Sequence, residues 1–140
     1  MEESSEIEYR RSIAKDLDAV ECLIQPHVAQ RKLLPRTSEE ISALLKTGFS
    51  AVAAGDVIGF AAIEIYSPKL AEILCLAVTD GYQGQGVGKH LVEHCLELAR
   101  AQNVLEVMAI SSAERFLREC GFDYTLPDEK RALFYQLRPR

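Results

Sequence analysis

The first third of the chain combines the apolar pattern of a strand with that of helices. Residues 7–13 alternate enough to predict a first strand. Apolar residues then recur at helical spacing, and we expect Asp16 to cap this helix and Pro26 to end or bend it. The capping box Thr37–Glu40, followed by an apolar stripe, predicts a second, short helix.

The middle of the chain has the pattern of a sheet. Residues 49–54, a turn at Gly55-Asp56 and residues 57–66 predict a β-hairpin. Residues 71–78 form an almost unbroken apolar run, which is typical of a strand buried on both faces. We therefore expect the centre of the sheet at residues 71–78.

Helical and strand patterns return after a glycine-rich stretch. A long amphipathic helix extends to about Arg100, and a strand is predicted at residues 104–110. Ser111–Glu114 is a second capping box and predicts a helix that ends at Gly121. A final pair of strands is expected near residues 122–125 and 132–137.

The composition is that of one ordinary globular domain. The chain has 140 residues, 48% hydrophobic and 26% charged, so we expect one domain over residues 7–140 after a disordered segment, residues 1–6. A net charge of −5 without a long Lys/Arg cluster argues against a nucleic-acid partner. No apolar run reaches the roughly 18 residues of a membrane span, and the acidic start differs from a signal peptide. These features predict a cytoplasmic protein.

Metal and disulfide chemistry have little support. The four cysteines are far apart and lie in apolar stretches, so we interpret them as small buried hydrophobic residues. The segment His90–His94 matches a zinc-binding H-x-x-E-H pattern. We interpret it as the face that an amphipathic helix turns to water, and we expect no metal.

The segment from Leu76 to Lys89 carries the clearest functional signal. It lies between a predicted strand and a long helix, and three of its glycines stand at alternate positions. The backbone N–H groups of such a loop and the helix N-terminus suit a pyrophosphate. A dinucleotide fingerprint that starts at Gly84 fails because its third glycine would fall on Lys89. A P-loop fails because Gln83 stands where the first glycine is needed.

The spacing Gln83-x-x-Gly86-x-Gly88 instead matches the Q/R-x-x-G-x-G/A signature of the GNAT superfamily of N-acetyltransferases. The order of predicted elements also resembles that superfamily over nearly the whole chain. The resemblance implies a single α/β (α+β) domain with a mixed central sheet and helices on both faces. It further implies acetyl-CoA as co-substrate, with the pantetheine arm along Leu76, Ala77 and Val78 and the phosphates at the N–H groups of Gln83, Gly84, Gln85, Gly86, Val87, Gly88 and Lys89.

Within the superfamily, the chain resembles the acetyltransferase domain of amino-acid N-acetylglutamate synthases. The matching segments are Pro35–Glu40, Ala71–Val78 and Phe116–Phe122. The resemblance implies that Arg36 and Arg138 hold a substrate carboxylate, which the planar guanidinium group matches. Those enzymes usually end in a Q-R-x-S-like stretch, and the serine is missing here. For Arg36, an ordinary surface arginine beside a helix cap is the alternative.

Acetyl transfer needs a base for the acceptor amine and a proton donor for the leaving thiolate. Glu72 is the charged residue beside the central apolar run and is our candidate base, with Glu64 as the alternative. The tyrosine that many GNAT enzymes place on the last helix corresponds to Leu117 here. Ser111 is the substitute candidate for the acid, although the N-cap of the last helix is a structural explanation for it.

The sequence thus predicts an enzyme that moves an acetyl group from acetyl-CoA to a primary amine. The expected acceptor is a small molecule that carries a carboxylate, such as an amino acid, with glutamate first. A protein or peptide amine acetyltransferase and an acetyl-CoA-binding module without turnover remain as alternatives. The superfamily resemblance also suggests a homodimer, and we expect neither a nucleic-acid nor a membrane partner.

Overall fold

The computed structural model describes residues 6–111, 113–125 and 133–139. The chain divides into two compact units, residues 1–109 and residues 110–140. The expectation of a disordered segment at residues 1–6 falls mainly on residues 1–5, which lie outside the described part.

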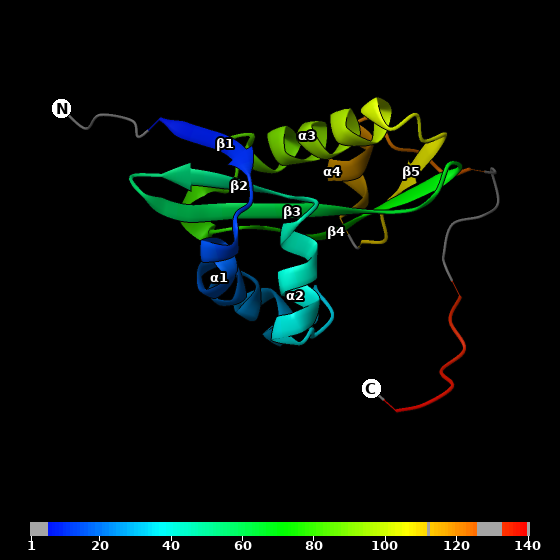
Figure 1. Ribbon diagram of the computed structural model, residues 1–140, viewed down its shortest axis with the longest axis horizontal. Helices are drawn as coiled ribbons and strands as arrows, with labels where there is room; N and C mark the ends of the chain where they lie inside the picture. The colour runs from blue at the N-terminus through cyan, green and yellow to red at the C-terminus, as the bar shows by residue number, and fades with distance from the viewer. Residues whose placement is uncertain (1–5, 112, 126–132, 140) are drawn as a thin grey trace. The chain divides into compact units, whose positions relative to one another are not determined.

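The first unit contains helices and strands in the predicted order (Figure 1). Its helices are η1 (Ala14–Asp16), α1 (Leu17–Ala29), α2 (Ser38–Leu45), η2 (Asp80–Tyr82) and α3 (Val87–Ala101). Its strands are β1 (Ile7–Arg11), β2 (Gly48–Ala53), β3 (Asp56–Ser67), β4 (Leu70–Val78) and β5 (Glu106–Met108). The predicted elements of this unit are therefore confirmed, with shifted ends.

The five strands form one sheet in the order β1-β2-β3-β4-β5. The first three pairs are antiparallel, and β4 pairs with β5 in parallel, so the sheet is mixed as predicted. The middle strand is β3, which corrects the expectation that residues 71–78 lie at the centre. Burial in β4 also alternates along the strand, because its even-numbered side chains are half-buried. An apolar run alone does not show which strands flank it.

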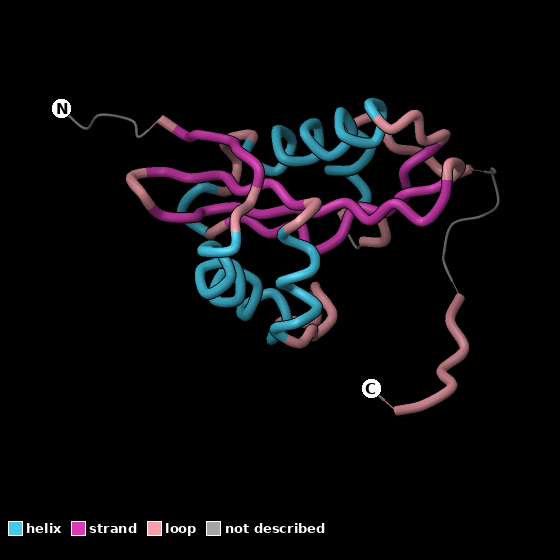
Figure 2. The backbone as a smooth tube through the Cα atoms, viewed as in Figure 1, coloured by secondary structure: helices cyan, strands magenta, loops and turns pink. Residues whose placement is uncertain are grey.

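Helices cover both faces of the sheet, with α1 and α2 on one side and α3 on the other (Figures 1 and 2). The core beneath α1 and α2 joins buried residues of both helices to Phe60, Ala62, Cys75 and Ala77. On the other face, a Cβ on Gly59 would lie 3.0 Å from side-chain atoms of both Val87 and Leu91. The missing side chain of Gly59 thus allows α3 to pack closely on the sheet.

The start of α1 differs from the prediction. Asp16 precedes the helix, but its carboxylate makes no capping hydrogen bond to it. It accepts hydrogen bonds from the backbone N–H of Ile13 (2.9 Å), the hydroxyl of Ser50 (3.0 Å) and both terminal nitrogens of Arg10 (2.8 and 2.9 Å). A buried carboxylate that joins two strands therefore replaces the expected cap. The helix also continues past Pro26 to Ala29, so Pro26 does not end it.

Two local predictions hold closely. The Thr37 hydroxyl accepts the N–H of Glu40 at 3.2 Å, and the Glu40 carboxylate accepts the N–H of Thr37 at 2.9 Å, which completes the capping box. The β2–β3 hairpin turns at Ala54 and Gly55, one residue earlier than expected. Both residues have positive φ, 51° and 84°, as the tight turn of a two-residue hairpin requires.

The second unit contains α4 (Glu114–Glu119). Ser111 is not its N-cap, because its hydroxyl accepts the N–H of Ala113 at 3.0 Å and the helix begins after Ala113. This local turn competes with capping. Residues 122–125 and 133–137 are not strands, which corrects that prediction, and Ala132 lies outside the described residues. A period-two pattern gives a segment the alternating side chains of a strand, but it does not specify a neighbouring strand that would hydrogen-bond its backbone.

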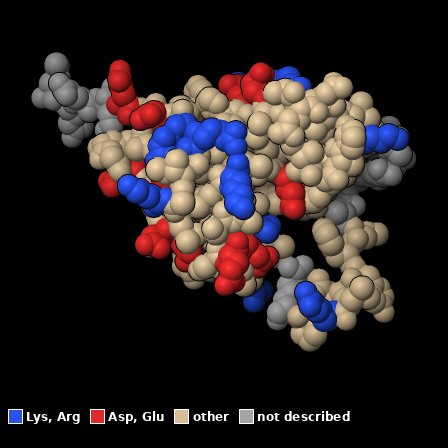
Figure 3. Space-filling model, in the orientation of Figure 1, with Lys and Arg blue, Asp and Glu red and all other residues tan. Residues whose placement is uncertain are grey.

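The molecular surface carries charges of both signs. On the face shown in Figure 3, Lys and Arg gather over β1 and the adjacent sheet edge, whereas Asp and Glu gather over α1 and α2. None of the described helices is long and apolar enough to cross a membrane. Cys75 and Cys95 are buried as expected, but Cys22 is exposed, which corrects the expectation that all four cysteines are buried.

Candidate functional site: the glycine loop and the neighbouring end of β4

The glycine-rich loop runs from the end of β4 through η2 to the start of α3. Gly84 and Gly86 adopt left-handed φ values of 82° and 81°. A Cβ on Gly84 would meet nothing within 4 Å, and one on Gly86 would meet only the His90 ring at 3.7 Å or more. The two glycines are thus required by backbone conformation, and the space above them is open to a ligand.

The glutamine side chains of the loop have structural partners. Gln83 donates through its amide Nε2 to the Val78 carbonyl (3.1 Å) and to the Asp80 carboxylate (3.3 Å). Gln85 donates to the Gly81 carbonyl at 3.4 Å. These hydrogen bonds fold the loop back on the end of β4. We expected the backbone N–H of Gln83 to face a phosphate. In the structure it donates to the Asp80 carbonyl at 3.3 Å, so it is not free.

The remaining backbone donors are arranged for an anion. The first N–H groups of a helix have no acceptor within the helix. Those of residues 84–89 have no hydrogen-bond acceptor within the described chain. Val87 anchors this end of α3 because its side chain is buried, whereas Lys89 is exposed. A pyrophosphate would meet free N–H donors and the positive end of the α3 dipole.

The two histidines of α3 stack on aromatic rings of the neighbouring strands. His90 donates from Nδ1 to the Gly86 carbonyl at 2.8 Å. The Tyr9 ring stacks on the rings of His90 and His94 at 5.0 and 5.8 Å, and Phe49 stacks on His94 at 5.3 Å. His90 is exposed, as expected for a helix face turned to water, whereas His94 is half-buried between the two aromatic rings. The described residues contain no group of three side chains suited to a metal ion.

β4 is distorted just before the loop. Ala62 pairs with Leu74 and Phe60 with Ala77, so two residues of β4, Cys75 and Leu76, lie opposite the single Ala61. Cys75 takes a φ of 56° in this bulge. Among the described residues, β5 pairs only with residues 70–72 of β4. Within the first unit, no described strand pairs with residues 73–78 of β4 on the β5 side, which includes the segment where the pantetheine arm was predicted to lie.

Arg36 precedes α2 and reaches the bulge of β4. Burial raises the pKa of the Cys75 thiol, and the positive charge of the nearby Arg36 side chain opposes that rise. Arg36 itself is half-buried. Its side chain therefore lies near the bulge of β4.

Glu72 lies on the sheet face that α1 and α2 cover further along. Leu74, two residues later, packs against the core beneath these helices, and strand alternation gives Glu72 the same side. Glu64 is directly opposite Glu72 on β3. The Tyr66 hydroxyl donates to Glu72 at 2.5 Å, a contact that no motif or spacing in the sequence indicates. Burial and the two carboxylates raise the pKa of Tyr66 above its ordinary value, so the phenol stays protonated.

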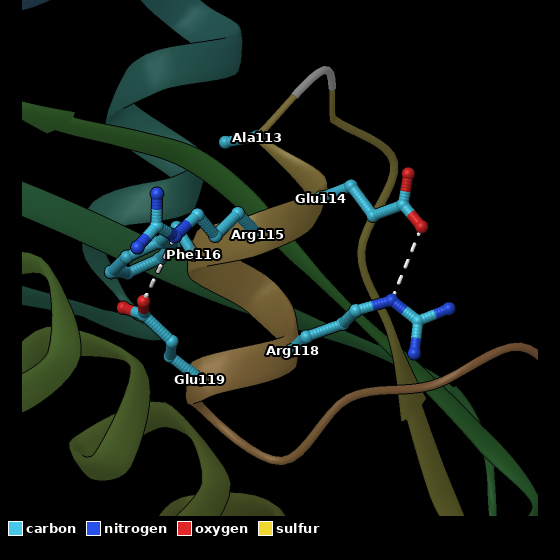
Figure 4. A pocket seen from close by; sticks show the side chains of 6 residues that line it. All are labelled: Ala113, Glu114, Arg115, Phe116, Arg118 and Glu119. Carbon is cyan, nitrogen blue, oxygen red and sulfur yellow. Dashed lines mark hydrogen bonds and ion pairs between the residues drawn. The ribbon is translucent and has the colours of Figure 1, made fainter.

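The other candidates belong to the second unit. Ser111 lies before α4, Leu117 lies within α4 and Arg138 is exposed near the end of the chain. A surface depression along α4 is lined by six residues, whose charged side chains pair with one another (Figure 4). Glu114 binds Arg118 at 3.1 Å, and Glu119 binds Arg115 at 3.5 Å. Because these exposed pairs lie on a single short helix, we do not consider the depression a candidate site.

Comparison with known proteins points to one family. The model of the acetyltransferase (GNAT) family matches residues 16–122. An uncharacterized N-acetyltransferase of Chlorobaculum tepidum is 30% identical over 113 residues, which cover 81% of this chain and 73% of that protein. An amino-acid acetyltransferase of Neisseria meningitidis is 27% identical over 125 residues, which cover 88% of this chain.

A solved structure gives the same indication. N-acetylglutamate synthase of Neisseria gonorrhoeae, complexed with coenzyme A and N-acetyl-glutamate, matches with a TM-score of 0.76 at 26% identity over 84% of this chain. The chain spans only 29% of the Neisseria meningitidis protein and 28% of the Neisseria gonorrhoeae chain. The family match over residues 16–122 includes the glycine loop and the bulged strand. The chain therefore belongs to the acetyltransferase (GNAT) family.

Proposed function

We propose that this acetyl-CoA-dependent N-acetyltransferase acetylates the primary amine of a small acceptor that carries a carboxylate, such as an amino acid. Bound acetyl-CoA supplies an activated thioester. The open glycine loop fits its pyrophosphate, because N–H donors surround a space that side chains would otherwise fill. The amino-acid acetyltransferase among the relatives and the N-acetyl-glutamate bound to the structural neighbour support this class of acceptor.

The observation that carries the acceptor proposal is the presence of Arg36 at the bulge of β4. Its side chain lies beside Cys75, three residues from Glu72 on the same strand. At about 3.3 Å per residue, the two positions are about 10 Å apart along the strand. A small amino acid and the two side chains can fill that span. We propose that Arg36 holds the acceptor carboxylate and that Glu72 takes the amine proton, directly or through water.

The roles of two further residues stay predictions. Arg138 is the second proposed anchor for the carboxylate, and Ser111 is the proposed donor to the leaving thiolate. Both lie in the second unit. Leu117, which stands at the usual tyrosine position, has no ionisable group, so the proton donor must be another group or water.

The decisive experiment offers labelled acetyl-CoA and a panel of amines to the purified protein. We expect transfer to free amino acids, glutamate being tested first, and none to lysine-rich peptides or polyamines. Turnover on those peptides or polyamines, with none on any free amino acid, would overturn the proposed acceptor class. No transfer to any amine despite acetyl-CoA binding would indicate a binding module.

An Arg36→Ala variant tests the anchor within the same assay. The KM for the acceptor should rise about 10-fold or more, which corresponds to one charged hydrogen bond, while the affinity for acetyl-CoA stays unchanged. Arg36→Lys should recover only part of this loss, because lysine lacks the planar fork. Lys32→Ala is the matched control, since it removes a positive charge from an exposed position of the same loop. An equal rise in KM for both alanine variants would exclude a specific anchor.

A further inference from the structure

Glu72 faces a second carboxylate across the sheet. The β3–β4 register places Glu64 directly opposite Glu72. Side chains at such positions have Cβ atoms about 4.5–5.5 Å apart, and like charges there repel each other. The Glu64 side chain is exposed and that of Glu72 is half-buried, so water screens this repulsion only in part.

Tyr66 supplies the hydrogen-bond donor between these carboxylates. Its hydroxyl donates to Oε1 of Glu72 at 2.5 Å, which leaves Oε2 of Glu72 for another partner. Burial, the hydrogen bond to Glu72 and the charge of both glutamates raise the pKa of Tyr66. The phenol therefore remains a donor throughout the pH range in which an amine acetyltransferase works.

The titratable and charged groups around Glu72 come from several elements. β3 contributes Tyr66 and Glu64, and β5 contributes the exposed Glu106, whose register partner is Leu70. Further along the same face lie Arg36, beside the β4 bulge, and Glu40 of α2, which interacts with Arg36. Among these groups, Tyr66 is the one that hydrogen-bonds Glu72 in the structure.

We propose that Tyr66 is a positioning residue: its hydroxyl holds the Glu72 carboxylate away from Glu64 and leaves Oε2 free to accept the proton of the acceptor amine. This inference rests on the proposed function of Glu72 as the base. Tyr66 does not itself exchange protons with the acceptor in this proposal. It stabilises the anionic form of Glu72 in one orientation.

The test begins with Tyr66→Phe, which removes the hydroxyl and keeps the ring. We expect kcat to fall about 10-fold, as for the loss of one hydrogen bond to a charged group, with little change in acetyl-CoA affinity. Because the anion loses its donor and still faces Glu64, the acidic limb of the pH profile should move up by about one pH unit. Tyr135→Phe is the matched control, since the Tyr135 side chain is 89% exposed.

Glu64→Gln tests the repulsion between the two carboxylates, and it should shift the pH profile in the opposite direction to Tyr66→Phe. Removing the opposing charge should move the acidic limb to lower pH, and the double variant Tyr66→Phe/Glu64→Gln should regain part of the lost kcat. A general loss of structure would not shift the limb in opposite directions in the two single variants. An acidic limb that stays in place in Tyr66→Phe would overturn the proposal.

A readout without turnover separates this inference from the proposed function. Carbon-13 NMR of side-chain carboxyls, assigned with Glu72→Gln, reports the titration midpoint of Glu72 directly. We expect the midpoint to rise in Tyr66→Phe and to fall in Glu64→Gln. If the midpoints shift in this way while Glu72→Gln retains full activity, Tyr66 positions Glu72 but Glu72 is not the base. If the midpoint is unchanged in Tyr66→Phe, the inference about Tyr66 fails, whatever the activity of Glu72→Gln.

Discussion

Individual residues near β4 have conformations that their chemistry alone does not explain. Cys75 has a φ of 56°, which is unusual for a residue with a side chain and costs of order 1–3 kcal/mol. The bulge that contains it moves the odd-numbered side chains of β4 from one sheet face to the other. Ile73 lies opposite Ile63, whereas Cys75 and Ala77 belong to the core beneath α1 and α2. The strain at Cys75 thus coincides with the place where β4 and Arg36 meet.

The first residue-scale prediction concerns Glu72. Glu72→Gln should lower kcat/KM by about 10²–10⁴-fold, because the amide cannot accept the amine proton. The loss should be smaller at high pH, where the amine deprotonates unaided, and acetyl-CoA affinity should persist. Steady-state rates between pH 6 and 10 provide the measurement.

Glu106→Gln is the matched control for this prediction, because Glu106 is an exposed carboxylate of the adjacent strand. It should leave the rate nearly unchanged. Normal turnover of Glu72→Gln at neutral pH on the native acceptor would contradict the assignment and make Glu64 the candidate base.

At the scale of elements, helix starts show when local signals suffice. Thr37 and Glu40 satisfy each other's backbone N–H groups, as their spacing predicts. Ser111, with the same spacing to Glu114, instead accepts the N–H two residues ahead. α3 starts at Val87, and its N-cap residue Gly86 has no side chain to cap it, so the first N–H groups of the helix stay available for an anion.

Gly86→Glu should weaken acetyl-CoA binding by about 10-fold or more, because it adds a negative charge where phosphates are expected and a charge at a helix terminus is worth up to ~2 kcal/mol. Gly86→Ala is the control, since any side chain is strained at a φ of 81° but alanine adds no charge. Isothermal titration calorimetry on folded protein compares the two. Equal affinities for both variants would show that charge at this position does not matter.

At the scale of the whole molecule, a partly buried ion pair between Arg10 and Asp16 ties the first strand to the rest. Asp16 is 5% exposed and links Arg10 of β1 to Ser50 of β2, whose hydroxyl lies 2.8 Å from that of Ser12. The hydrogen bond from Arg10 is the main cause that lowers the pKa of the Asp16 carboxyl below its ordinary value of 3.8, against the effect of burial. The folded state therefore favours the ionised carboxylate.

The pH dependence of stability follows from that direction. Asp16 contributes stability above about pH 4, and this contribution is lost as the pH falls through the lowered folded pKa. Asp16→Asn should reduce the free energy of unfolding at pH 7 by about 1–3 kcal/mol, because buried donors lose a charged acceptor. The variant should also lose less stability than the parent between pH 7 and pH 3.

Urea denaturation at pH 7 and pH 3 measures both effects. Asp18→Asn is the control, because Asp18 is exposed in the first turn of α1, and its change should stay below about 1 kcal/mol. The same pH dependence in Asp16→Asn and the parent would rule out this role for Asp16.

The sequence determined the parts of the fold that depend on neighbouring residues. Apolar periodicity predicted α1, α2 and α3, because each helix buries one face that recurs at a fixed spacing, and the turn residues between two apolar segments predicted the β2–β3 hairpin. The glycine spacing predicted the open loop, because left-handed φ at Gly84 and Gly86 is a local property of glycine.

The features that join distant segments depend on long-range contacts. The tertiary structure placed β3 rather than β4 in the middle of the sheet, gave Asp16 a partner in Ser50, brought Tyr9 against α3 and set Tyr66 on Glu72. Strand order, register and cross-strand contacts depend on which backbones pair, and a single strand carries no record of its neighbour. For the same reason, the pattern of residues 133–137 predicted a strand, although the structure shows none there.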